Sequence, residues 1–88
     1  MNNCLSVISC IISDSEASSA VNLKLHEYSE SIIARLGVPC REYGVSVISI
    51  VLHGSSNTIS TLSGALGKIP GVKVKSVQVK VGDSCPRP

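Results

Sequence analysis

The chain has 88 residues, the length of one small domain, and carries a formal net charge of +2. It has no Phe, no Trp and two Tyr, so its core must be built from Val, Ile, Leu and Ala. A thin aliphatic core gives a marginal fold, and sharing apolar surface with a second copy is a common remedy. The mild positive charge argues against direct nucleic-acid binding, and no apolar run has the roughly 20 residues of a membrane helix.

The four Cys residues, at positions 4, 10, 40 and 85, do not form a Cys-x-x-Cys motif. The N-terminus lacks the basic region of a signal peptide, and its apolar run is interrupted by Ser and Cys. We therefore expect a cytoplasmic protein with reduced thiols.

The first part of the chain predicts a strand followed by a long helix. Residues 4–12 are rich in β-branched side chains, which is typical of a strand. Ser13 and Glu16 then fit a capping box. The helix is expected to run as far as Gly37 and Pro39, which would end it. Its apolar positions recur at steps of three and four: Ala17, Val21, Leu25, Tyr28, Ile32 and Leu36.

A short strand over residues 38–43 and a turn at Gly44 lead into a second strong strand, residues 45–53. That strand is apolar on both faces, and a single layer of helices can cover one of them. The face expected to meet a second copy is formed by Val45, Val47 and Val51.

The last part of the chain predicts a helix and a strand. The segment 55–57, Ser-Ser-Asn, offers helix caps, and Pro70-Gly71 would close the helix before a strand at 72–81. The apolar phase of that strand changes midway, which predicts a β-bulge near Lys75-Ser76. The helix has one apolar face: Ile59, Leu62, Leu66 and Ile69.

The predicted order is strand, helix, strand, strand, helix, strand. It indicates an α+β, ferredoxin-like βαββαβ fold, in which a four-stranded antiparallel sheet carries two helices on one face. We expect one ACT-like domain over residues 1–81 and a flexible C-terminal tail over 82–88.

The stretch GALGKIPGVKVK, residues 64–75, could be a phosphate-binding loop, a KH-type Gly-x-x-Gly loop, or a helix leading into a strand. The phosphate-loop pattern needs Ser or Thr after its Lys, and Ile69 stands there. In the KH alternative, Leu66 would be exposed to phosphates although it continues the apolar face of the helix. The helix-to-strand interpretation is favoured, with Gly64 and Gly67 expected to permit close packing.

Two segments resemble a known family. They are LHEYSESIIARLGVP, residues 25–39, and TISTLSGALGKIPGVKVKSVQVK, residues 58–80, in which the run from Leu62 to Lys75 is the most specific part. They are similar to the small regulators named for the iron-only hydrogenase system, over about residues 4–81. That family is ACT-like, ferredoxin-folded and similar to the C-terminal domain of nickel-responsive repressors.

The resemblance implies a regulatory module, of transcription or of an enzyme, that assembles as a homodimer or homotetramer. It does not identify a cofactor. The nickel-responsive relatives add a DNA-binding ribbon-helix-helix segment, for which we expect no room here. Their nickel site uses three His and a Cys, whereas this chain has His26 and His53, so that site is not transferred.

Two candidate sites remain. In ACT-like modules small effectors bind at the first strand-to-helix turn, which here contains Ser13, Asp14 and Ser15; simple helix capping is the alternative. His53 and Cys40 could approach across an antiparallel pair, and a dimer would then supply four N and S ligands. The favoured interpretation of that second pair is a solvent-facing His and a small buried Cys without a metal.

No enzyme is predicted. Acylphosphatase, which shares the fold, needs an Arg in the first loop, and residues 13–19 contain none. No paired carboxylates and no Ser-His or Cys-His constellation can be recognised either. We therefore expect a sensing module that acts through ligand- or partner-dependent assembly, or else a structural interaction module without an effector.

Overall fold

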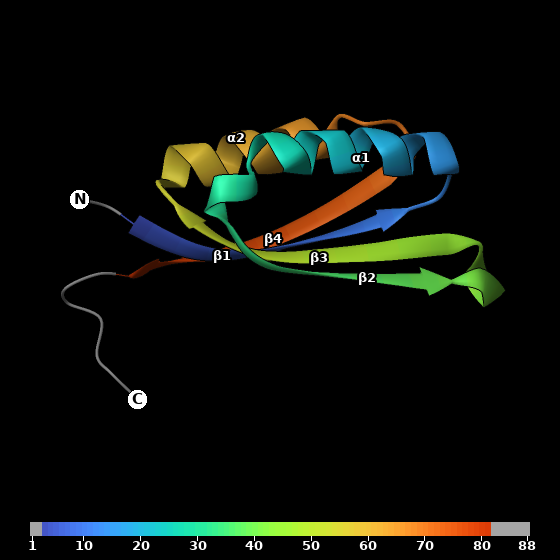
Figure 1. Cartoon of the computed structure of the whole chain (residues 1–88), viewed down its shortest axis with the longest axis horizontal. Coiled ribbons are helices and arrows are strands. Elements are labelled where there is room, and N and C mark those ends of the chain that lie inside the picture. The colour runs from blue at the N-terminus through green and yellow to red at the C-terminus, as the bar shows by residue number, and fades with distance from the viewer. Residues whose placement is uncertain (1–2, 82–88) are drawn as a thin grey trace.

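The computed structural model describes residues 3–81 and shows an antiparallel sheet with two helices on one face (Figure 1). The strand order is β2-β3-β1-β4, which confirms the ferredoxin-like α+β fold. The predicted tail, 82–88, lies outside the described residues. The elements are β1 (Asn3–Ile12), α1 (Ser15–Glu27), η1 (Ser29–Ser31), β2 (Ile32–Cys40), η2 (Arg41–Tyr43), β3 (Val45–Gly54), α2 (Ser56–Gly67) and β4 (Val72–Val81).

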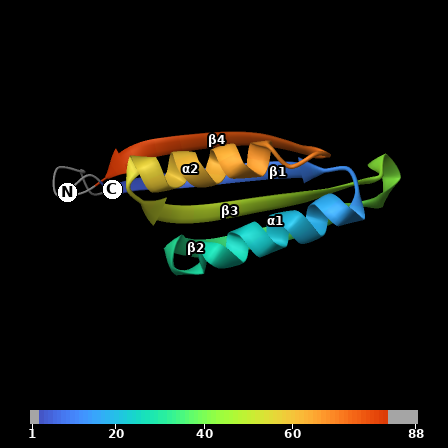
Figure 2. The same cartoon turned by 90° about the horizontal axis from the view of Figure 1, so that it is seen from above.

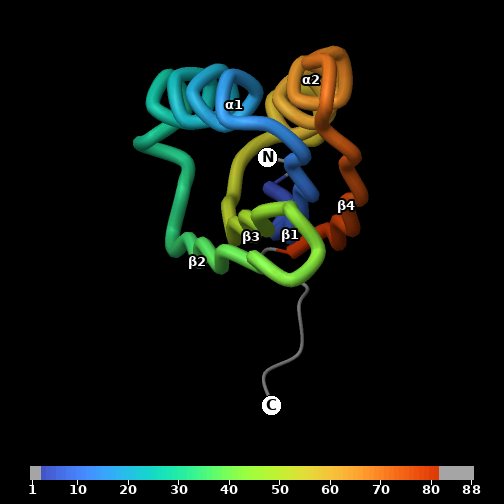
Figure 3. The backbone as a smooth tube through the Cα atoms, turned by 90° about the vertical axis from the view of Figure 1, so that its right-hand side faces the viewer, coloured from blue at the N-terminus to red at the C-terminus, as the bar shows by residue number. Residues whose placement is uncertain are grey.

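The two helices cover the sheet unequally. Seen from above, α2 lies over β1 and β4, while α1 lies toward β2 (Figure 2). The view along the sheet shows the same division (Figure 3). Helix α2 packs against β4, β1 and β3, and α1 packs against β1 and α2 but makes few contacts with β2. One edge of the helix layer is therefore loosely closed.

The core lies between the helices and the central strands β1 and β3. Alternate residues of β1 are buried, as period-two alternation requires, and Ser6 among them donates its hydroxyl to the Val77 carbonyl at 2.8 Å. Three residues of each helix complete the core. Its main members are Cys4, Ile8, Cys10, Ile12, Ala17, Val21, Leu25, Ile48, Ile50, Leu52, Ile59, Leu62 and Leu66.

The prediction that the first helix reaches Leu36 is wrong. Helix α1 ends at Glu27, and Ile32 and Leu36 lie on β2 instead. The step of four from Ile32 to Leu36 is compatible with a strand as well as with a helix. The irregularity of β2 near Ile32 puts the two side chains on opposite faces, so that Ile32 packs against the core while Leu36 is exposed. Ile32 and its neighbour Ile33 are both β-branched, which favours a strand. Pro39, expected to end a helix, instead lies in β2, an edge strand of the sheet, where proline is tolerated.

The cap of α1 is Asp14, not Ser13 as predicted. The Asp14 Oδ1 atom accepts a hydrogen bond from the Ala17 N–H at 2.7 Å. The Ser13 hydroxyl donates instead to the Gly71 carbonyl at 3.1 Å. The Ser13 N–H donates to the same Gly71 carbonyl at 2.9 Å, and these two bonds hold the turn before α1 against the loop that leads into β4.

The predicted bulge at Lys75-Ser76 is also wrong. Strand β4 pairs with β1 in unbroken register from Val72 to Val81, and the irregularity lies in β2 near Ile32. The change of apolar phase reflects a change of face. Val72 and Val74 pack under the helices, whereas Val77 and Val79 are on the opposite face.

The stretch 64–75 is the end of α2 followed by β4, as favoured from the sequence. The expectation that Gly64 and Gly67 permit close packing is wrong, because a Cβ atom built at either position meets nothing within 4 Å.

Candidate functional site

The face of the sheet opposite the helices is apolar, and the described residues leave it uncovered. We call it the open sheet face. All four strands contribute to it, and seven of its side chains are between 41% and 68% exposed: Leu5, Val7, Ile11, Leu36, Val38, Val77 and Val79. A largely apolar surface of this extent is typical of an interaction site rather than of a free monomer surface.

The predicted interface residues lie on the open sheet face. Register places Val51 beside Val7, and Val47 beside Ile11. Val45 follows on the same side of β3 by period-two alternation. All three valines of β3 are half-buried by their neighbours. Their role in an interface stays a prediction.

The open sheet face has a polar centre and one charged corner. The hydroxyls of Ser9 and Ser49 are 2.7 Å apart and hydrogen bonded across β1 and β3. On β4, Lys75 lies beside Ser9 and Lys73 lies beside Ile11. The long lysine side chains can reach water at the rim while their stems cover apolar surface.

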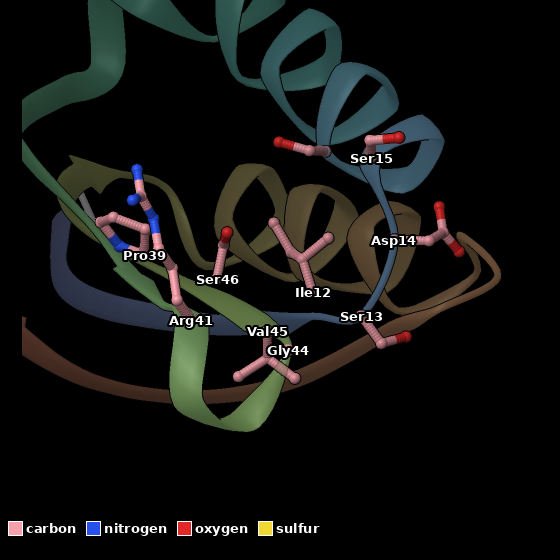
Figure 4. A pocket seen from close by; sticks show the side chains of 10 residues that line it. Ile12, Ser13, Asp14, Ser15, Pro39, Arg41, Gly44, Val45 and Ser46 are labelled. Atoms are coloured by element: carbon pink, nitrogen blue, oxygen red, sulfur yellow. The ribbon is translucent and has the colours of Figure 1, made fainter.

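A cavity of about 520 Å³ lies on the helix side of the sheet, where β1 leads into α1 and where β2 turns into β3. Figure 4 shows its side chains. Ile12 and Pro39 supply apolar walls, α1 contributes Ser15 and Ser18, and β3 contributes Ser46. This mixture of apolar walls and a few polar groups is the usual composition of a small-molecule site.

One guanidinium group and one carboxylate line the same cavity. Arg41 comes from the hairpin between β2 and β3, and its side chain runs alongside Pro39 (Figure 4). Asp14 comes from the turn before α1, and its carboxylate points away from Arg41 toward the loop before β4 (Figure 4). Among residues 3–81, no salt bridge involves Arg41.

The predicted effector residues Ser13, Asp14 and Ser15 all line this cavity. Asp14 acts as the helix cap, so the capping interpretation holds for that residue. Their binding of an effector stays a prediction.

Sequence reasoning missed Arg41, Ser18 and Ser46. The predicted topology could have pointed to Arg41 and Ser46, because the end of β1 and the start of β3 lie at the same end of an antiparallel pair.

The hypothesis that Cys40 and His53 approach each other is wrong within one chain. Cys40 pairs with Val45 at one end of β3, and His53 pairs with Leu5 at the other. Eight residues of strand separate these positions by about 26 Å. Within the part of the chain that the structure describes, no group of three or more His, Cys, Asp or Glu residues could hold a metal ion.

The thiols of the described residues are free and differ in access. Cys4 and Cys10 are buried on the helix side of β1, as their even spacing predicts, and Cys40 is half-buried. Burial raises the pKa of the Cys10 thiol, since desolvation disfavours the thiolate.

Neither helix α1 nor helix α2 is long and apolar enough to cross a membrane.

Comparison with known proteins identifies relatives of the chain. Residues 4–76 match the family described as "TM1266-like: Iron-only hydrogenase system regulator, putative". The solved structure of the uncharacterized protein TM1266 from Thermotoga maritima is similar, with a TM-score of 0.84 and 40% sequence identity. The alignment covers 89% of this chain and 99% of that one. Among curated proteins, no significant match was found.

Proposed function

The chain belongs to this family of iron-only hydrogenase system regulators, and we propose that it is a small regulatory module that assembles with itself through the open sheet face. Assembly would depend on a small effector or on a partner, and the module itself would catalyse no reaction. The single observation that carries the proposal is the apolar surface spread over all four strands on the uncovered side of the sheet.

The occupant that best fits this surface is a second copy of the chain. Antiparallel sheets that expose one face to water commonly carry polar side chains on that face, whereas here the exposed positions of β1 include Leu5, Val7 and Ile11. A two-fold axis brings the same patch of each copy together, so an apolar face is complementary to itself without any matching charge pattern. The lysines of β4 stand at a corner, where they can remain in water.

An effector can influence such an assembly only if it binds one assembly state more tightly than the other. The cavity offers a route, because Val45 lines it and also lies on the strand that carries the open sheet face. A ligand there would contact the hairpin at the rim of the proposed interface. This proximity favours an effector-dependent module over a purely structural one.

The test is the assembly state of the untagged full chain, purified without oxygen or chelator. We expect native mass spectra and sedimentation velocity to show a dimer or tetramer, and the same spectra would report any retained ligand. Val7→Lys should produce a monomer, since it places a strongly hydrated charge between Val51 and Val77.

The matched control is Leu23→Lys, because Leu23 is equally apolar and 68% exposed but lies on α1. This variant should assemble like the wild type. A wild-type chain that stays monomeric at about 100 μM, where micromolar affinity would give mostly dimer, contradicts the proposal. So does a Val7→Lys variant that assembles normally.

A further inference from the structure

We propose that the cavity beside Arg41 binds a small organic anion, with the Arg41 guanidinium pairing with a carboxylate or phosphate group of that ligand. The inference deepens the proposed function by naming the effector class, and it rests on that proposal for its regulatory meaning. The binding itself is a separate physical claim. Its starting point is a hollow with apolar walls that is lined by one cationic side chain and three serine residues.

The Arg41 guanidinium is available to a ligand. Within residues 3–81 it takes part in no salt bridge and no side-chain hydrogen bond. The carboxylate of Asp14, which lines the same cavity, is bound to the Ala17 N–H and is turned the other way (Figure 4). A planar guanidinium can bind a carboxylate or phosphate through two parallel hydrogen bonds.

Serine side chains line the same hollow as Arg41. Ser15, Ser18 and Ser46 line the cavity, and none of these hydroxyls makes a side-chain hydrogen bond to the described residues. Each can donate to an anionic oxygen or accept from a ligand hydroxyl. Ile12 and Pro39 provide apolar contact for a hydrocarbon body. The site thus suits a molecule with an acidic end and a carbon skeleton.

The hollow continues along the gap between α1 and β2. A second hollow of about 250 Å³ shares Ser18, Pro39 and Ser46 with the first and reaches Arg35. This extension exists because α1 makes few contacts with β2. Arg35 donates from Nη2 to the Asn22 Oδ1 atom at 2.5 Å, so it is held at the far end of the groove. The groove therefore fits an elongated molecule better than a single inorganic ion.

Gly37 keeps this second hollow open. It lines the groove on β2, opposite Ile48, and a Cβ atom built there meets nothing within 4 Å. A larger side chain can therefore enter the groove without striking the protein. Gly37→Leu would then block the part of the site that accommodates the length of the ligand.

The experiment is a titration of the ¹⁵N-labelled full chain, followed by amide chemical shifts. The probes are sodium citrate and glycerol 3-phosphate, which separate the carboxylate and phosphate sources of the anion, with sodium chloride at equal ionic strength as the reference. We expect saturating shifts at Ser15, Gly44 and Ser46 with at least one probe. Arg41→Gln should weaken binding about tenfold or more, the effect of losing a charge-assisted hydrogen-bonded pair.

Lys80→Gln is the matched control, because it removes one charge at the opposite end of the sheet, beside Cys4. It should bind like the wild type. Gly37→Leu should weaken the binding of citrate and glycerol 3-phosphate more than that of sodium phosphate, which is added to this comparison as a short anion without a carbon skeleton. The inference is overturned if neither probe gives a saturating shift at roughly 20 mM, where a millimolar ligand would be bound. It is also overturned if Arg41→Gln binds as tightly as Lys80→Gln.

The two proposals can fail separately. A chain that binds the probes but stays monomeric refutes the proposed assembly and leaves the anion site standing. A chain that dimerises but shows no Arg41-dependent binding refutes the anion site alone.

Discussion

Replacing Gly71 by Ala tests how the loop before β4 holds the start of α1. The φ angle of Gly71 is +87°, and a Cβ atom there would lie 2.6 Å from the Asp14 Oδ2 atom. That distance is too short for any real contact, so Asp14 would have to move and its cap to Ala17 would weaken. The left-handed backbone costs roughly 1–2 kcal/mol for alanine, and losing the cap costs about 1 kcal/mol more. We therefore expect Gly71→Ala to lower the free energy of unfolding by about 2–3 kcal/mol.

The assay is urea unfolding followed by far-UV circular dichroism at one fixed protein concentration, since association would shift the midpoint. Asp14→Ala already lacks the cap, so in that background Gly71→Ala should cost only the backbone term, roughly 1–2 kcal/mol. An equal cost in both backgrounds would show that the contact with Asp14 is not the cause. A neutral Gly71→Ala substitution would refute the backbone argument as well.

Four further outcomes are expected, three from the same unfolding measurements and one from thiol labelling. Gly64→Ala should raise the free energy of unfolding by about 0.5–1 kcal/mol, because its Cβ atom meets open space on a helix; a loss would reveal an unseen contact. Leu62→Ala should lower it by roughly 2–5 kcal/mol, since Leu62 is fully buried, and a cost below 1 kcal/mol would contradict the packing. Burial raises the pKa of the Cys10 thiol, so as the pH rises the unfolded chain loses this proton before the folded chain does. The free energy of unfolding should therefore fall above about pH 8.5, and it should fall less steeply in Cys10→Ala. In a Cys85→Ser background, iodoacetamide should modify Cys40 before Cys10, and equal rates would contradict the burial.

The order of helices and strands could be predicted from the sequence, because misplacing the boundary between α1 and β2 did not change that order. A spacing of four between apolar residues such as 32 and 36 is compatible with a helix and with a strand, so the pattern could not locate the end of α1. The tertiary sheet decided it, by pairing Leu36 with Ser49 and Val38 with Val47. The helix became shorter and the strand longer, and the topology was unchanged.

The open sheet face was partly visible in the sequence, since a strand with apolar residues on both sides must be covered twice. The cavity was not, because it depends on bringing Arg41 from one turn close to Ser15 from another. The Cys40 and His53 hypothesis failed for a related reason. Antiparallel pairing folds Cys40 back on Val45 through a short hairpin, so a residue eight positions further along β3 must lie far away.

The hairpin between β2 and β3 connects the two proposed sites. Its residues from Arg41 to Gly44 are exposed, and little packing holds them in one arrangement. Exposed hairpins with few buried contacts belong to the least stable part of a fold, where a ligand can most readily select one conformation. Arg41 would bind the anion, and Val45, four residues later, begins the strand that carries the open sheet face. An anion that orders this hairpin would pre-organise the rim of the interface, which would lower the entropy cost of assembly and so couple the two sites.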